Sequence, residues 1–128
     1  MALTISRTET QLQTVAGTFT AMDNLMASTV SSSFVVPSGV SRLVSVDIGI
    51  AADAAEEFAS QIRLAGNGME NSEQFVNGPA VVAAAAGTAQ SNTTKNTDFN
   101  VISGNSIECA IATTDAALIS ASVVMTFA

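Results

Sequence analysis

A two-residue alternation in residues 44–51 is the feature that most constrains how this chain can fold. Apolar side chains alternate there with small or polar ones: Val44, Val46, Ile48 and Ile50 against Ser45, Asp47, Gly49 and Ala51. Side chains two residues apart share one face of a strand, whereas a helix needs apolar positions three and four apart. The segment therefore predicts a β-strand with one buried and one exposed face.

A short strand and a tight turn are predicted just before it. Residues 33–36, SFVV, are rich in β-forming side chains and end at Pro37, which has no amide hydrogen for a sheet ladder. Gly39 follows two residues later and can adopt the positive φ that many turns require. Residues 33–51 therefore predict strand, turn and strand.

The same alternation recurs along the rest of the chain. It is carried by Phe58, Ser60, Ile62 and Leu64, by Ile107, Cys109 and Ile111, and by Ile119, Ala121, Val123, Met125 and Phe127. The inward positions are best suited to Phe34, Phe58, Phe99 and Phe127. Turn-forming residues separate these segments, and 128 residues suit one domain. We predict an all-β protein, an antiparallel β-sandwich of about eight strands over residues 33–128.

Residues 1–32 permit two interpretations. Leu12, Val15, Phe19, Met22 and Met26 follow steps of three and four, which favours a helix. The many threonines of the same segment favour extended structure instead. We expect an N-terminal arm or an edge strand here, with the helix as the alternative for residues 9–29.

Two further segments lack a clear period. Residues 80–86, AVVAAAA, are apolar at every position, which fits a strand covered on both faces, a short helix, or a contact between subunits. Residues 88–97, TAQSNTTKNT, have no hydrophobic anchor and predict an exposed loop. The candidate interface residues are Leu12, Phe19, Met22, Met26, Ala80, Val81, Val82 and Ala84.

The low charge content points to self-association. Charged residues make up 12% of the chain, against about 25% in an average soluble domain. A surface of small neutral side chains is easily desolvated, since buried unpaired charge is what costs most. Eleven acidic and only four basic residues argue against nucleic-acid binding and against an anionic membrane surface. No apolar segment is long enough to span a bilayer.

The chain lacks the residues that most catalytic and metal sites need. It has no histidine and a single cysteine, Cys109, so no Ser-His-Asp or Cys-His set and no internal disulfide can form. The acidic residues of 53–57, DAAEE, are more simply a solvated turn than a calcium or glycosidase site. We predict a protein that is not an enzyme and uses no cofactor or metal.

Two segments carry a resemblance to small jelly-roll virion proteins. These are FVVPSGVSRLVSVDIGI at 34–50 and VISGNSIECAIATTDAALISASVVMTF at 101–127. They resemble the capsid cement or decoration proteins of tailed bacteriophages and single jelly-roll capsid subunits, and the second also resembles the last strands of trimeric TNF/C1q-like domains. The resemblance implies a jelly-roll fold, a homo-oligomer with a trimer favoured, and a major capsid protein or another virion protein as partner.

The same resemblance implies a location in the virion. The first residues lack the basic start and apolar core of a secretory signal, so we expect synthesis in the host cytoplasm. The alternative function is a non-enzymatic binding module that recognises a carbohydrate or receptor. It would use predicted loops at 67–77 and 90–97.

Overall fold

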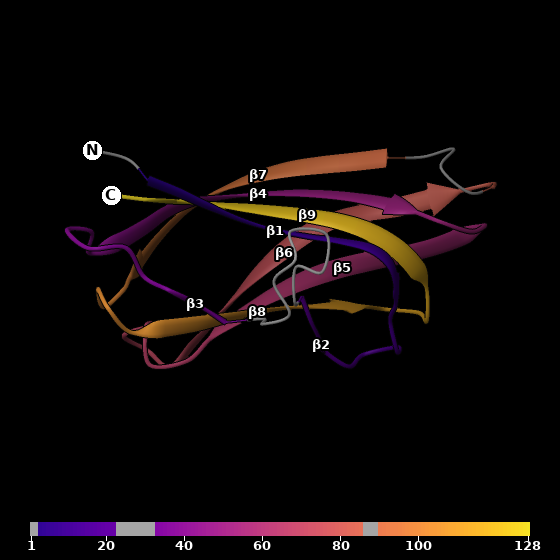
Figure 1. Ribbon diagram of the computed structural model, residues 1–128. Helices are drawn as coiled ribbons and strands as arrows, with labels where there is room; N and C mark the ends of the chain where they lie inside the picture. Colours follow the sequence, from indigo (N-terminus) through magenta and orange to yellow (C-terminus); the bar gives the residue numbers. More distant parts are fainter. Residues whose placement is uncertain (1–2, 23–32, 86–89) are drawn as a thin grey trace.

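The computed structural model describes residues 3–22, 33–85 and 90–128, and these residues form strands and turns without any helix. Two antiparallel sheets lie one over the other (Figure 1). The strands are β1 (Leu3–Gln13), β2 (Thr20–Ala21), β3 (Ser33–Val35), β4 (Arg42–Ala52), β5 (Glu56–Ala65), β6 (Glu73–Ala83), β7 (Gln90–Asn100), β8 (Ser106–Thr113) and β9 (Leu118–Phe127).

The strand order is that of a jelly roll. The first sheet has the order β1-β9-β4-β7, and the second has the order β2-β8-β5-β6, with β3 also pairing with β8. From β6 onward, consecutive strands alternate between the two sheets, as they do when a double-sheet jelly roll closes. The predicted all-β, jelly-roll-like sandwich is therefore confirmed.

The core lies between the two sheets and is formed by the alternation seen in the sequence. In β9 every second side chain is buried, and β5, β6 and β8 of the second sheet contribute buried side chains that face it. Phe34, Phe58 and Phe127 are buried, as predicted, and Phe99 packs against the core from a partly buried position. The rings of Phe34 and Phe127 meet edge to face, with centroids 6.2 Å apart.

One inward position in β4 was predicted wrongly. Leu43 is fully buried and Val44 is partly exposed, because the pairing register of β4 shifts between Leu43 and Ser45. A bulge of this kind inserts one residue and reverses the face on which the preceding side chains lie. Beyond it, Val46, Ile48 and Ile50 are buried as the alternation predicts.

The predicted loop at 88–97 is also wrong from Gln90 onward. Residues Gln90–Asn100 form β7, which pairs with β4 along its length at the edge of the first sheet. Both faces of this strand carry polar side chains, so no hydrophobic alternation marks it, although its threonines have high β-propensity. Residues 80–83 belong to β6, where Val81 is buried while Ala80 and Val82 are exposed.

The N-terminal residues are extended rather than helical wherever the structure describes them. β1 is an edge strand of the first sheet, with Leu3 opposite Phe127 beside the end of β9 (Figure 1). The chain then crosses to the second sheet, where the hydroxyl oxygens of Thr14 and Thr113 lie 2.5 Å apart and the Gly17 amide donates to the Thr113 carbonyl at 2.9 Å. Residues 23–32 lie outside the described part.

Candidate self-association faces

The described residues hold no group of three acidic or cysteine side chains placed to bind a metal ion. Cys109 is fully buried in β8, and desolvation by burial raises the pKa of its thiol to about 12. The thiol is therefore protonated at neutral pH and is a poor nucleophile. The remaining candidate sites lie on the two outer faces of the sandwich.

Among the residues that the structure describes, no helix has the length and apolar character needed to cross a membrane.

The outer face of the first sheet is built from short, mostly uncharged side chains, and we call it the serine–threonine face. The register places them in three rows across the strands: Thr4–Thr126–Ser45–Asn96, Ser6–Val124–Asp47–Thr94 and Thr8–Ser122–Gly49–Asn92. Asp47 is the only charged residue in these rows. Its carboxylate accepts a hydrogen bond from the Thr94 hydroxyl at 2.5 Å. The rows therefore present a single charge, which a hydroxyl donor already meets, so that the desolvation cost of the face is concentrated at Asp47.

The serine–threonine face has a shallow hollow at its centre. Two adjoining depressions of about 320 and 340 Å³ share Gly49, Asn92 and Ser122. A Cβ atom at Gly49 would come within 2.5 Å of the Asn92 Oδ1 atom, so the Asn92 amide lies over the glycine. The absence of a side chain at Gly49 thus makes room for the Asn92 amide, and hydroxyl and amide groups are among those that line the hollow.

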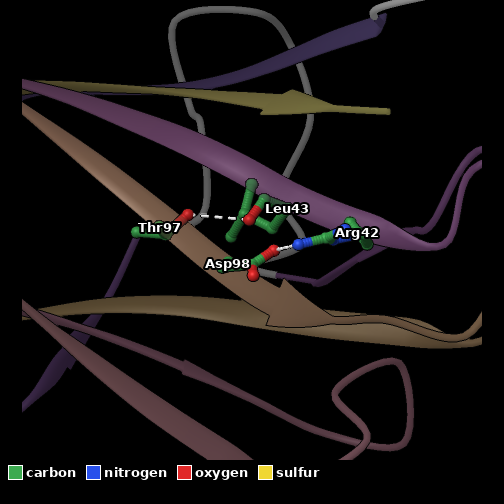
Figure 2. Close-up of polar contacts among 4 residues, drawn as sticks. All are labelled: Arg42, Leu43, Thr97 and Asp98. Atoms are coloured by element: carbon green, nitrogen blue, oxygen red, sulfur yellow. Dashed lines mark hydrogen bonds and ion pairs between the residues drawn. The ribbon is translucent and has the colours of Figure 1, made fainter.

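Polar contacts at the bulge join the beginning of β4 to the last residues of β7 (Figure 2). The Thr97 hydroxyl donates to the Leu43 carbonyl at 2.8 Å, which satisfies a backbone acceptor where the ladder is interrupted. Beside it, Arg42 and Asp98 form an ion pair whose side chains are 50% and 66% exposed. These contacts fix the register that places Leu43 in the core.

The outer face of the second sheet carries alanines next to a pair of amides at its centre, and we call it the alanine face. In the register of β5 with β6, Glu57 lies opposite Val82, Ala59 opposite Ala80, Gln61 opposite Asn77 and Arg63 opposite Phe75. On the β8 side, Ala112 and Ala110 lie opposite Gln61 and Arg63. Val82 is 67% exposed and Phe75 is 45% exposed, so this sheet face leaves two large apolar side chains in contact with solvent.

A groove runs along the alanine face. Two depressions of about 310 and 340 Å³ share Ala59 and Thr114, and they extend from Phe19 at one end to Val82 at the other. The amides of Gln61 and Asn77 on the groove floor hydrogen-bond to each other at 3.0 Å. Alanines and paired amides therefore form a concave floor between two larger apolar ends.

Phe19 closes one end of this groove through aromatic and cationic contacts. Its ring centroid lies 5.7 Å from that of Phe75, and the Arg63 Cζ atom lies 5.3 Å from the Phe19 centroid. The Arg63 Nη2 atom is 3.6 Å from the Glu108 Oε1 atom, while its buried Nε atom has no hydrogen-bond partner among the described residues. The guanidinium is thus stacked on a ring, with donor capacity to spare.

The structure brings three of the predicted interface residues together and separates the others. Phe19, Ala80 and Val82 lie on the alanine face, and Ala84 is exposed just beyond the end of β6. Met22 and Val81 are fully buried in the subunit's own core, where another copy could not reach them. Leu12 packs against the core from a partly buried position, and Met26 lies outside the described residues.

Four residues of this face were missing from the predicted set. Phe75 and Ala59 are exposed next to the predicted residues, and Glu57 and Arg63 carry charge at its two ends. The alternation of residues 57–64 already indicated that Glu57, Ala59 and Arg63 point away from the core. The pairing with β6, which brings them beside Val82 and Phe75, leaves no local signal.

Comparison with known proteins agrees with the strand order. No family model matches the sequence, and a search of curated proteins found no similar sequence. Among solved structures, a chain of infectious bursal disease virus, Gx strain, aligns over 98% of this chain and 32% of its own, with 13% identity and a TM-score of 0.55. The globular domain of zebrafish complement 1qA aligns over 98% and 94%, with 11% identity and a TM-score of 0.52.

The chain has the jelly-roll fold of these proteins. Eiger TNF from S. frugiperda shares it, over 97% of this chain and 91% of its own, with 7% identity and a TM-score of 0.50. This jelly roll spans about a third of the viral chain that it matches, 32%, and nearly all of the complement domain, 94%. The resemblance to jelly-roll virion proteins therefore holds for the fold.

Proposed function

We propose that this jelly roll is a structural virion protein that self-associates, favouring a homotrimer, and decorates or stabilises a viral capsid. Its partners are further copies of itself and the major capsid protein or another virion protein, and no catalysis is involved. The observation that carries the proposal is the serine–threonine face, whose three cross-strand rows contain one charged residue.

The mechanism is burial of neutral, small-residue surface between copies. Short hydroxyl and amide side chains lose little rotamer entropy when they are covered, and they can hydrogen-bond across an interface directly or through water. A contact of standard size needs about 800 Å² from each partner. A four-stranded face whose rows hold one charged residue suits such a contact.

The test places one charge at the centre of this face. Ser122→Arg puts a guanidinium beside Gly49, in the row Thr8–Ser122–Gly49–Asn92, and Ser38→Arg puts the same group in the exposed 37–39 turn as the matched control. We expect light scattering after size exclusion to give a trimer for the natural chain and for Ser38→Arg, and a monomer for Ser122→Arg. A monomer for all three proteins would refute self-association.

The capsid partner is tested separately. The chain would be coexpressed with the major capsid protein encoded in the same genome, and the assembled particles would be sedimented. We expect the natural chain and Ser38→Arg to sediment with the particles. If neither does, the decoration role fails even where the oligomer forms.

A binding module is the second candidate, and one observation favours it. The hollow around Gly49, Asn92 and Ser122 is lined by hydroxyl and amide groups, which are the hydrogen-bonding groups that sugars engage. Of the two loops expected to form such a site, residues 90–97 are part of strand β7 instead, and residues 73–77 of the other are part of β6. A glycan array and a calcium titration test this function, and loss of glycan binding in Asn92→Ala would locate it in the hollow.

A further inference from the structure

The alanine face has a large apolar side chain at each of its two ends. The charged side chains beside them are acidic at one end and basic at the other. Along β5 it begins at Glu57 and ends at Arg63, and along β6 the neighbouring side chains at these two levels are Val82 and Phe75. Between the ends lie Ala59 and Ala80, which leave the groove floor low. An apolar projection thus stands at each end of a hollow, with an acid beside one and a base beside the other.

Both charged groups are able to accept a new partner. Glu57 is exposed, and no cation contacts its carboxylate within the described residues. The Arg63 side chain is 32% exposed, and its Nη2 atom makes a long contact of 3.6 Å to Glu108 Oε1. A guanidinium carries five donors, so a second carboxylate can join the first.

We propose that two copies of this chain pack alanine face against alanine face about a two-fold axis that runs across the strands at the level of Ala59 and Gln61. Such an axis turns one face end for end over the other. Glu57 of each copy then meets the partner's Arg63, and Val82 of each copy meets the partner's Phe75. Each apolar projection sits over the opposite end of the facing groove.

The charges select this orientation over its alternative. With the axis along the strands, equal levels would face each other, so Glu57 would meet the partner's Glu57 and Arg63 the partner's Arg63. Like charges brought together at an interface cost free energy, whereas the end-for-end arrangement pairs opposite charges twice. Strands of the two facing sheets also run nearly parallel or antiparallel in this arrangement, as in aligned sheet packing.

This contact goes beyond the proposed trimer, because it uses the other sheet. A closed trimer in which every copy carries one additional two-fold contact can join neighbouring trimers into a continuous layer. The second sheet would then supply the contact between assemblies, and the first sheet the contact within them.

Cysteine pairs across the proposed axis test the geometry. One preparation carries Val82→Cys and another carries Phe75→Cys, and each is treated with a short bismaleimide both alone and after the two are mixed. Cys109 does not interfere, because it is fully buried. We expect crosslinked dimers in the mixture, and only monomers from either variant alone or from Ser38→Cys mixed with Val82→Cys.

A second pair covers the case in which Phe75→Cys fails to fold. The second pair is Ala80→Cys and Asn77→Cys. Under the same axis, position 80 of one copy faces position 77 of the other, and both positions are exposed. Crosslinking of Val82→Cys alone would overturn the end-for-end orientation, and no crosslinking in either mixture would overturn the contact. Light scattering on the same samples separates the two proposals, since a trimer without these crosslinks leaves the first intact.

Discussion

Phenylalanine occurs both in the core and on the alanine face. Replacing one phenylalanine of each kind by alanine therefore tests the division of the sandwich into core and outer face. Phe127 is fully buried near the end of β9, where its ring meets that of Phe34. Phe75 is 45% exposed on the second sheet and touches the ring of Phe19. Truncating both to alanine removes the same atoms from a closed and from an open environment.

The expected losses differ several-fold. A buried Phe→Ala change costs about 3–5 kcal/mol through lost transfer free energy and the cavity left behind. The site around Phe127 cannot relax easily, because the Ala128 amide and carbonyl are hydrogen-bonded to β4 through Arg42 and Ser41. Phe75→Ala loses mainly one aromatic contact, which is worth about 1 kcal/mol.

Urea unfolding in the Ser122→Arg background, which we expect to be a monomer, followed by circular dichroism, measures both losses. With a slope of about 2 kcal/mol per M, Phe127→Ala should lower the midpoint by about 2 M and Phe75→Ala by about 0.5 M, at unchanged slope. Phe75→Ala should instead weaken the alanine-face contact. If both variants lose the same stability, or Phe75→Ala loses more, then the division into core and outer face is wrong.

Three further predictions concern an exposed ion pair, two glycines and the buried cysteine. Arg42→Ala should cost less than about 1 kcal/mol, and less again in high salt, because the Arg42–Asp98 pair is half exposed; urea unfolding at two NaCl concentrations checks this. Gly66→Ala should cost about 1–3 kcal/mol, since φ is +125° and the new Cβ would lie 2.7 Å from the Ser106 carbonyl oxygen, whereas Gly39→Ala, at φ +81° with open space, should cost less. For Cys109, burial raises the folded pKa to about 12 from 9.0, so the folded state holds its proton longer. Stability should therefore fall above pH 9 by about 1.4 kcal/mol per unit relative to Cys109→Ala, and an equal pH dependence in both proteins would contradict this.

The core could be predicted from the sequence wherever the alternation is regular. Ile107, Cys109 and Ile111 are buried as expected, because each lies two residues from the next on a strand of unbroken pairing. Val44 was predicted wrongly because a bulge is set by pairing with two neighbouring strands and by the Thr97 contact. Nothing local to Val44 marks that shift.

β7 could not be predicted, because it is polar on both faces. Its inward positions Ser91 and Thr93 lie opposite Ile50 and Ile48 at the edge of the sheet, where partial exposure tolerates hydroxyls. The strand forms because β4 offers it a ladder, not because its own side chains form a core. A hydrophobic period cannot reveal a strand stabilised in this way.

The alanine face could be predicted in part. The apolar run at 80–86 and Phe19 were singled out as interface candidates, and Ala80, Val82 and Phe19 do share one face. Their common position depends on the register between β5 and β6 and on the crossing at Thr14–Thr18, which are tertiary features. Glu57 and Arg63 lie at opposite ends of the face because both belong to β5, and that register places Val82 and Phe75 beside them.

The placement of the acidic residues leads to a last prediction. Asp53, Glu56, Glu70, Glu73 and Asp115 lie in turns or at the first residue of a strand, so much of the net charge of −7 sits at the ends of the sandwich rather than on the serine–threonine face. Copies that meet through this face repel one another through these ends. Salt at about 0.15 M screens charges beyond about 8 Å.

We therefore expect the trimer to dissociate less as NaCl rises from low to physiological concentration. Mass photometry measures this dissociation. A contact driven by ion pairs would weaken instead, as the Glu57–Arg63 pairs of the alanine face should. Opposite salt dependences for the trimer and for the Val82–Phe75 crosslink would thus separate the two faces in one titration. A trimer that weakens with salt would contradict assembly through a face whose rows hold one charged residue.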